Sequence, residues 1–313
     1  MKKIIFLQLF LIFNVVLFAQ EQTITLETAG GDIKGTLLLP DSVKKVPVAL
    51  IISGSGPTDR DGNQSSMKNN SLKYLAEELG KQGIASVRFD KRAIGESAGA
   101  ATSEASLRFE TYINDVKDWI RMLSEDKRFT RIIVIGHSEG SLIGMVASSG
   151  NPKVSAFVSI AGTSLPADEL LKVQLASQPQ GIRDIIFPKL DSLKHGDTLH
   201  NVTVMLYSLF RPSVQPYMIS WFRYNPQEWI TRLNIPILIL QGDKDIQISV
   251  DDAQNLSKAA PGAVLKIIPN MNHVLKECNT LDRQDQITIY NNPDLPVKKD
   301  LVEVIAGFIT NLK

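Results

Sequence analysis

The chain has very little cysteine and very little surplus charge. Among its 313 residues there is one cysteine, Cys278, which excludes an intrachain disulfide and a metal site built from several thiolates. The 34 Lys and Arg residues nearly balance the 33 Asp and Glu residues, giving a formal net charge of +1. No excess of positive charge therefore points to nucleic acid or to an anionic membrane as a partner. Histidine is also scarce, with four residues, so few side chains can serve as a general base.

The start of the chain lacks an apolar run long enough for a membrane-spanning helix. Residues 4–19 are apolar apart from two polar residues, which is short of the roughly 20 residues that a span needs. Lys2 and Lys3 precede this run, and small Ala19 is followed by polar Gln20. This order is typical of a secretory signal peptide. We therefore expect residues 1–19 to be cleaved, leaving a secreted or periplasmic protein with no membrane span in the mature chain; a membrane anchor is the alternative. No cysteine lies near the cleavage site, which disfavours a lipoprotein.

After residue 20, strand and helix patterns alternate. Residues 46–53, VPVALIIS, form a continuous apolar run, typical of a strand covered on both faces. Such alternation implies right-handed crossovers and hence a mostly parallel central sheet flanked by helices, an α/β fold. Strands are predicted at residues 23–28, 33–39, 46–53, 84–89, 132–135, 154–160, 235–240 and 264–268, and helices at residues 72–79, 107–123, 141–148, 252–259 and 301–312.

The alternation is interrupted between residues 163 and 231, where only helical patterns occur. We interpret this segment as a helical cap inserted into one α/β core, which consists of residues 20–162 and 232–313. The end of the insertion is aromatic and contains Trp221 and Phe222. Because ligand pockets have largely apolar walls, these two side chains are candidates for substrate binding. The alternative is that they pack in the cap's own core.

A serine between two glycines separates a strand pattern from a helix pattern. In the stretch GHSEGS, Ser138 follows the apolar run of residues 132–135 and lies between Gly136 and Gly140. A strand, a Gly-x-Ser-x-Gly turn and a helix form a nucleophile elbow, in which a strained turn exposes the serine oxygen. Side chains at the two glycines would collide with the neighbouring strands and the helix. The pattern predicts Ser138 as a catalytic nucleophile; a plain glycine-rich turn is the alternative.

A serine nucleophile needs a general base, and His273 is the candidate. His137 adjoins the serine on the elbow, so its side chain is expected to point away. His195 and His200 fall in the insertion, where surface histidines are common. His273 lies on the loop after the last apolar strand, and in this fold class the serine, the acid and the histidine follow one another in that order.

The carboxylate that orients the base is expected in the stretch LQGDKDIQIS, which offers Asp243 and Asp245. Asp243 directly follows Gly242, where strand-end hydrogen bonds are expected to hold it. Asp245 lies further along the loop, where it can reach the loop that bears His273. We therefore predict Asp245 as the acid, with a loop-bracing or solvated role for Asp243.

The negative oxygen of a tetrahedral intermediate needs N–H donors held in place. One is expected to be the backbone N–H of Glu139, directly after the nucleophile. The other is expected from the loop after the third strand, SGSGPTDRDG, where the N–H of Ser55 is the candidate.

Two aspartates in that same loop, Asp59 and Asp61, raise the possibility of a metal site. Aspartates in a turn are more often solvated or paired with an arginine, here Arg88 or Arg92. We therefore expect ion pairs and no metal.

The motifs GHSEGS, GDKDIQI and NMNH, in that order, resemble those of the α/β-hydrolase superfamily. The stretches SGSGPTDRDGN and VRFDKRAIGES narrow the resemblance to bacterial EstD-type carboxylesterases and serine-aminopeptidase-like hydrolases. This resemblance implies an α/β-hydrolase fold, a helical cap over the site, and hydrolysis of carboxylic esters without a cofactor. Relatives also tend to carry the acid three residues after the glycine, which is Asp245 here. Ala93 is a departure, because relatives often have glycine there.

Three functions follow from these patterns. The first is an exported serine esterase that acts on a small-molecule ester, with the oligomeric state left open. The second is an aminopeptidase-like amide hydrolase, which would need carboxylates to hold a free amino terminus. The third, a non-catalytic binding module, is disfavoured because every catalytic role is filled. The acidic residues of the insertion, which are not clustered for such a role, are Asp168, Glu169, Asp184, Asp191, Asp197 and Glu228.

Overall fold

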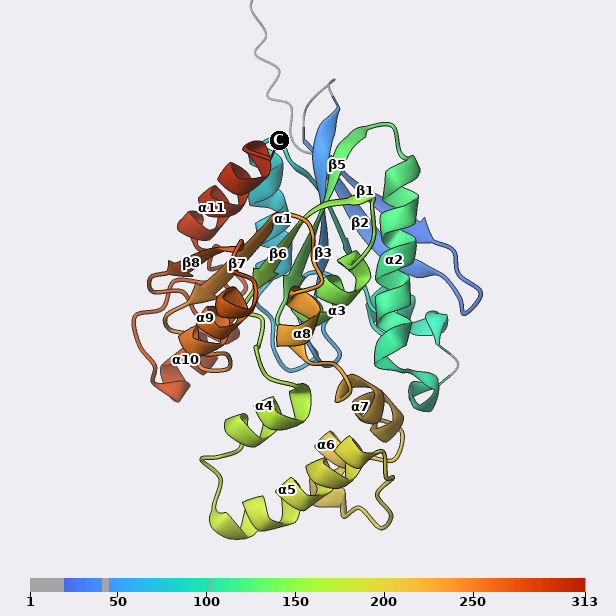
Figure 1. Cartoon of the computed structure of the whole chain (residues 1–313), viewed down its shortest axis with the longest axis vertical. Helices are drawn as coiled ribbons and strands as arrows, with labels where there is room; N and C mark the ends of the chain where they lie inside the picture. The colour runs from blue at the N-terminus through green and yellow to red at the C-terminus, as the bar shows by residue number, and fades with distance from the viewer. Residues whose placement is uncertain (1–19, 41–44, 102, 313) are drawn as a thin grey trace, which may run out of the picture.

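A central sheet of eight strands organises the molecule. The structure is a computed structural model that describes residues 20–40, 45–101 and 103–312 (Figure 1). The strand order is β1-β2-β4-β3-β5-β6-β7-β8. The strands are β1 (Gln20–Leu26), β2 (Ile33–Leu39), β3 (Val46–Ile52), β4 (Ala85–Phe89), β5 (Phe129–His137), β6 (Val154–Ile160), β7 (Ile237–Gly242) and β8 (Val264–Ile268).

The direction of the strands confirms the predicted mostly parallel sheet. β2 pairs antiparallel with both β1 and β4, whereas every pair from β4 through β3 to β8 is parallel. The carboxyl ends of the parallel strands therefore meet at one edge of the sheet. Loops that leave this edge are where an open α/β sheet binds its ligand.

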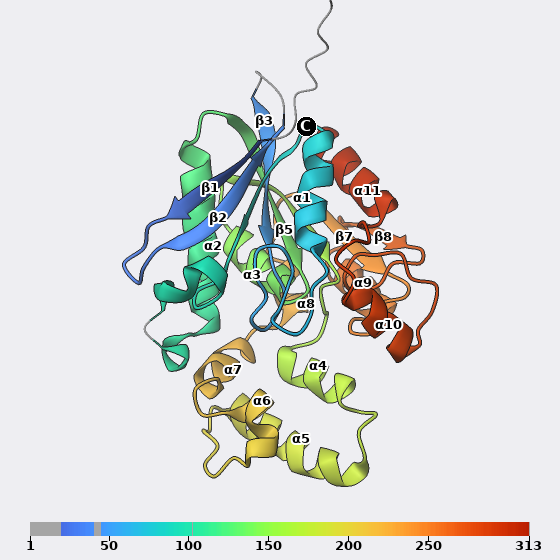
Figure 2. The ribbon, with the colours of Figure 1, turned by 180° about the vertical axis from the view of Figure 1, so that it is seen from behind.

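Helices cover both faces of the sheet (Figures 1 and 2). Since side chains alternate along a strand, each strand contributes to two separate apolar layers. One layer packs against α2, α3, α8 and α9, and the other packs against α1 and α11. The helices of the core are α1 (Ser71–Lys81), α2 (Phe109–Glu125), α3 (Glu139–Ser148), α9 (Val250–Ala259), α10 (Arg283–Tyr290) and α11 (Lys299–Thr310).

Five helices lie between β6 and β7, and all but the last of them, α8, form a separate layer at the carboxyl edge of the sheet, in the lower part of Figure 1. They are α4 (Ala167–Gln174), α5 (Gln180–His195), α6 (Tyr207–Phe210), α7 (Gln215–Trp221) and α8 (Pro226–Ile230). α4 to α7 share a small apolar core of their own. α8 differs, because it contacts α3 and α9 and buries Ile230 in the main core. The final residues of the predicted insertion thus belong to the α/β core.

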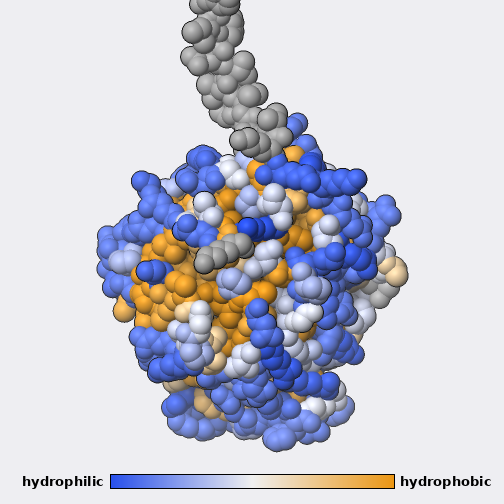
Figure 3. Space-filling model, turned by 45° about the horizontal axis from the view of Figure 1, so that its top comes forward, coloured by the Kyte–Doolittle hydropathy of each residue, from blue (hydrophilic) through white to orange (hydrophobic). Residues whose placement is uncertain are grey.

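The surface at the end opposite the cap is mixed. Figure 3 shows hydrophobic residues gathered on this face, with polar residues around them. None of the described helices combines the length and the apolar composition that crossing a bilayer requires. The predicted signal peptide, residues 1–19, lies outside the described residues.

Candidate active site

Ser138 occupies a strained turn between β5 and α3. Its backbone angles are φ 55° and ψ −122°, a conformation that typically costs a non-glycine residue about 1–3 kcal/mol. A Cβ atom at Gly136 would lie 2.2 Å from the carbonyl oxygen of Gly140. One at Gly140 would lie 2.4 Å from the carbonyl oxygen of Ile52. Strand and helix therefore approach too closely for any side chain on either flank of the serine.

His273 and Asp245 meet across the loops that follow β8 and β7. His273 Nδ1 lies 2.8 Å from Asp245 Oδ2, and both side chains are almost fully buried. Asp245 Oδ1 accepts the backbone N–H groups of Gln247 at 2.8 Å and Ile248 at 3.0 Å. An ionised carboxylate can only accept, so Nδ1 carries a proton and Nε2 is left free to take one.

The surroundings of Asp245 favour its ionised form. Burial alone would raise the pKa of the Asp245 carboxyl, but the His273 ring and the N–H groups of Ile248 and Gln247 together outweigh it. The pKa is consequently lowered from its usual value of 3.8. A charged carboxylate at this position can stabilise an imidazolium ring.

Asp243 has different partners. Its Oδ1 accepts the backbone N–H of Asn270 at 2.6 Å, and its own N–H donates to the carbonyl of Ile268 at 3.3 Å. These bonds tie the end of β7 to the end of β8. Asp243 braces the loops, and Asp245 faces the histidine.

Ser138 and His273 line one small cavity of about 60 Å³, together with Gly54 and Ser55. In the described part of the chain, no hydrogen bond joins Ser138 Oγ to His273 Nε2. Such bonds are often long in the absence of substrate and shorten in the reacting complex. Because Ser138 and His273 line this cavity together, a carbonyl group that enters it would meet both side chains.

His137 lies closer to the site than its place in the sequence suggested. Its ring centroid is 4.9 Å from that of His273, and its Nε2 is 2.8 Å from the His273 carbonyl oxygen. The expectation that its side chain points away needs correction, because it lines the same small cavity as Ser138. Burial, followed by the nearby His273 ring, lowers the pKa of His137 to about 3. His137 is therefore a neutral donor that holds the His273 loop.

The two predicted oxyanion donors lie beside the serine. Ser55 lines both cavities that Ser138 lines, and Glu139 is the first residue of α3. A Cβ atom at Gly54 would come within 3.1 Å of Ser138 Cβ, so the two loops are in contact there. Within the described residues, the backbone N–H groups of Ser55 and Glu139 have no protein acceptor. Both are available to an incoming oxygen.

A larger cavity of about 610 Å³ extends from Ser138 towards the cap. Trp221 lines it, whereas Phe222 is fully buried in the cap's own core and does not. The two side chains point to different sides of the chain at the end of α7, which sequence neighbours on a helix generally do. The apolar lining includes Ile94, Leu107, Leu170, Leu171, Leu209, Val214, Met218, Trp221 and Ile248.

The two acidic residues that line this cavity are Glu104 and Glu139, and both have cationic partners. Glu104 pairs with Arg211, and Glu139 pairs with Lys91. None of the acidic residues of the insertion lines it.

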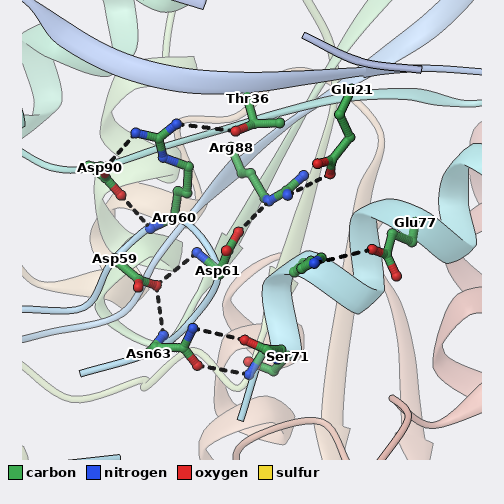
Figure 4. A network of polar contacts seen from close by, with 12 residues as sticks. Glu21, Thr36, Asp59, Arg60, Asp61, Asn63, Ser71, Glu77, Arg88 and Asp90 are labelled. Carbon is green, nitrogen blue, oxygen red and sulfur yellow. Dashed lines mark hydrogen bonds and ion pairs between the residues drawn. The ribbon is translucent and has the colours of Figure 1, made fainter. Parts of the chain in front are cut away.

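The aspartates of the loop after β3 form ion pairs and turn contacts (Figure 4). Arg88 Nε donates to Asp61 Oδ1 at 2.7 Å, and Asp59 Oδ1 accepts the N–H groups of Asp61 and Asn63. Arg92 instead pairs with Asp115 of α2. Among the described residues, no group of three or more His, Cys, Asp and Glu side chains is arranged to hold a metal ion.

This chain is similar to known hydrolases. A family model described as serine aminopeptidase, S33, matches residues 67–201. The esterase EstD of Thermotoga maritima is 24% identical over 254 residues, which are 77% of this chain and 57% of that protein. The chain thus spans little more than half the length of this curated relative.

Solved structures share the fold. Est1E from Butyrivibrio proteoclasticus, with ferulic acid bound, has a TM-score of 0.64 at 15% identity. The matched region covers 92% of this chain and 98% of the Est1E chain. The α/β hydrolase GrgF from a Penicillium species has a TM-score of 0.62 at 16% identity, with coverages of 94% and 99%. The chain therefore has the α/β-hydrolase fold and resembles the EstD-type carboxylesterases and serine-aminopeptidase-like hydrolases of that superfamily.

Proposed function

We propose that this protein is an exported serine hydrolase that cleaves carboxylic esters of small molecules through an acyl-enzyme. The observation that carries the proposal is the strained Ser138 facing the same small cavity as His273, whose ring is bound to the buried Asp245. The similarity to an esterase supports the choice of ester as substrate.

The reaction has two halves. Ser138 Oγ attacks the ester carbonyl carbon while His273 Nε2 takes its proton. The resulting negative oxygen accepts hydrogen bonds from the N–H groups of Ser55 and Glu139. The C–O bond to the alcohol then breaks, and His273 returns the proton to the leaving oxygen. Water repeats these steps on the acyl-enzyme, which releases the carboxylic acid and free serine.

The larger cavity supports an apolar acyl or aryl group as part of the substrate. Its lining combines aliphatic side chains with the aromatic rings of Tyr112, Tyr217 and Trp221. Est1E, a structural neighbour, carries ferulic acid, an aromatic carboxylic acid. An aminopeptidase-like activity is less well supported, because Glu104 and Glu139 are already neutralised by Arg211 and Lys91. No other acidic side chain of the described residues lines the cavity to bind a free amino terminus.

The test is covalent labelling combined with a substrate series. The wild-type protein should react with a fluorophosphonate and hydrolyse p-nitrophenyl esters in preference to aminoacyl anilides. Ser138→Ala should abolish labelling and lower hydrolysis by about 10³-fold or more. Labelling that persists in Ser138→Ala would remove this serine from the proposal, and a preference for anilides would favour the peptidase alternative.

Export is part of the same proposal and rests on residues 1–19. A bacterial host should release the protein from its periplasm with Gln20 as the first residue. The N-terminal sequence of the purified protein checks this, and an intact Met1 in a membrane fraction would favour an anchor instead.

A further inference from the structure

A buried lysine connects the two proposed oxyanion donors. Lys91 lies just after β4, its side chain is 2% exposed, and it lines the larger cavity beside Ser138. Its Nζ donates to the carbonyl oxygen of Gly54 at 2.6 Å and lies 3.4 Å from Glu139 Oε1. Nζ also lies 5.3 Å from the centre of the Tyr112 ring. A buried ammonium is costly unless it is paired and hydrogen-bonded, so these contacts fix its position.

The first contact acts on one donor through a shared peptide unit. The carbonyl of Gly54 and the N–H of Ser55 belong to the same planar, trans peptide, so they point in opposite directions. Holding the Gly54 oxygen therefore sets the direction of the Ser55 N–H. A charged donor on that oxygen also polarises the amide, and hydrogen bonds in such chains strengthen one another. The Ser55 N–H becomes both better aimed and a stronger donor.

The second contact acts on the other donor. The Glu139 side chain is 3% exposed and reaches Lys91, while its backbone N–H begins α3 next to Ser138. One ammonium group thus links the loop after β3 to the first turn of α3. These segments are far apart in the sequence, and the donors must converge on one oxygen to act together.

We propose that Lys91 is a positioning residue that aligns the Ser55 and Glu139 N–H groups for the tetrahedral intermediate. The role rests on the proposed function, since it concerns the same reaction. Lys91 acts through Gly54 and Glu139, and its ammonium is occupied by them. It therefore supports the transition state more than the binding of a neutral substrate.

The matched control is Lys194 of α5. Its Nζ also contacts one carbonyl, that of Phe222 at 2.6 Å, and one carboxylate, Asp168 at 3.0 Å. Lys194 does not line either cavity. Replacing each lysine by methionine removes the same kinds of contact and keeps most of the side-chain volume. Only Lys91→Met should affect the chemistry.

The experiment measures kcat and KM for p-nitrophenyl butyrate, together with the rate of fluorophosphonate labelling. Loss of one oxyanion donor lowers kcat by about 10²–10³-fold in other hydrolases, so misalignment in Lys91→Met should lower it by about 10- to 100-fold. KM should change little, labelling should slow in parallel, and Lys91→Arg should recover part of kcat. Lys194→Met should keep the wild-type kcat.

Three results would overturn the role. They are a wild-type kcat in folded Lys91→Met, an equal loss in Lys194→Met, or a change in KM alone. If Lys91→Met does not fold, Glu139→Gln weakens one contact and keeps the backbone N–H; it should lower kcat with KM unchanged, and an unaltered kcat would count against the role. A wild-type protein that neither labels nor hydrolyses esters would instead overturn the proposed function, and the role of Lys91 with it.

Discussion

Asp243 and Asp245 stand two residues apart after β7, yet their carboxylates have unrelated partners. Asp243 binds a backbone N–H of the β8 loop, and Asp245 binds the ring of His273. The difference arises because Asp243 still follows the strand end, while Asp245 lies where the chain has turned towards the next loop. Position in the loop, and not residue type, gives each carboxylate its role.

Replacing each aspartate by asparagine should separate these roles. Asp245→Asn keeps the shape but offers an amide donor to Nδ1, which favours the wrong tautomer of His273 and should lower kcat by up to about 10⁴-fold. Asp243→Asn should cost far less activity, because the side-chain oxygen can still accept the Asn270 N–H. Ester hydrolysis by the two folded variants checks this, and the reverse ranking would move the catalytic role to Asp243.

His137 should make stability depend on pH. Its pKa is about 3 in the folded protein against an ordinary value of 6.5, so between these values the unfolded chain binds the extra proton. The free energy of unfolding should therefore be highest above pH 6.5, where His137 is neutral in both states. It should fall as the pH drops from 6.5 towards 3, and the loss at pH 5 should be about 2 kcal/mol. Urea unfolding at several pH values measures this free energy, and its slope against pH should be shallower for His137→Gln than for the wild type. His195→Gln, which changes an exposed histidine, should keep the wild-type slope; identical slopes in all three proteins would contradict the prediction.

Helix α7 joins the cap to the core through aromatic contacts. Trp221 stacks on Phe109 of α2 with ring centroids 6.1 Å apart, and Ser220 Oγ accepts the Phe109 N–H at 2.8 Å. Phe222 follows directly but packs in the cap's own core with Leu190 and Phe210. The helix thus has one side at the larger cavity and the other in the cap's own core.

The two neighbouring aromatic residues should therefore give opposite phenotypes. Trp221→Ala enlarges the cavity and should shift the preferred acyl length upwards. Phe222→Ala removes a fully buried ring and should destabilise the protein by about 3–5 kcal/mol with little change in preference. Thermal unfolding and a p-nitrophenyl ester series measure both effects. A changed preference in Phe222→Ala, with normal stability, would place that side chain in the binding site after all.

At the scale of the whole molecule, the cap and the core are joined by an ion pair beside the larger cavity. Arg211, between α6 and α7, pairs with Glu104, which follows β4 in the core. Both side chains are more than a third exposed, so solvent screens the pair. The pair is therefore a weak contact between the cap and the core.

Glu104→Gln should loosen the cap without unfolding the core. Global stability should fall by less than about 1 kcal/mol, as is usual for exposed pairs. Hydrogen exchange in α4 to α6 should become faster, while β3 and β5 stay protected, and high salt should make the wild type resemble the variant. Glu277→Gln, which breaks an exposed pair with Lys298 away from the cap, should leave cap exchange unchanged. Faster exchange in the sheet of Glu104→Gln would show that the pair supports the core.

Several features of this protein are determined by short stretches of sequence. The continuous apolar run of residues 46–53 is typical of a strand buried on both faces, and the structure has β3 there. Gly136 and Gly140 mark the elbow because the backbones there leave no space for a Cβ atom. Helix α10 was not predicted, because its sequence RQDQITIY does not place apolar residues along one face of a helix. Its anchor is Gln286, which donates to the carbonyls of Lys244 and Thr280.

The tertiary structure alone decided the contacts that align the site. Lys91 and Glu139 are 48 residues apart, and His137 and the His273 carbonyl are 136 apart. Periodicity and turn chemistry act over a few residues, so they point to Ser138, Asp245 and His273 as candidates but not to the groups that hold them in place. Those supporting groups depend on the fold, because the fold determines which loops lie side by side at the carboxyl edge of the sheet. Burial there makes an unpaired charge too costly, so Lys91 and Glu139 lie together.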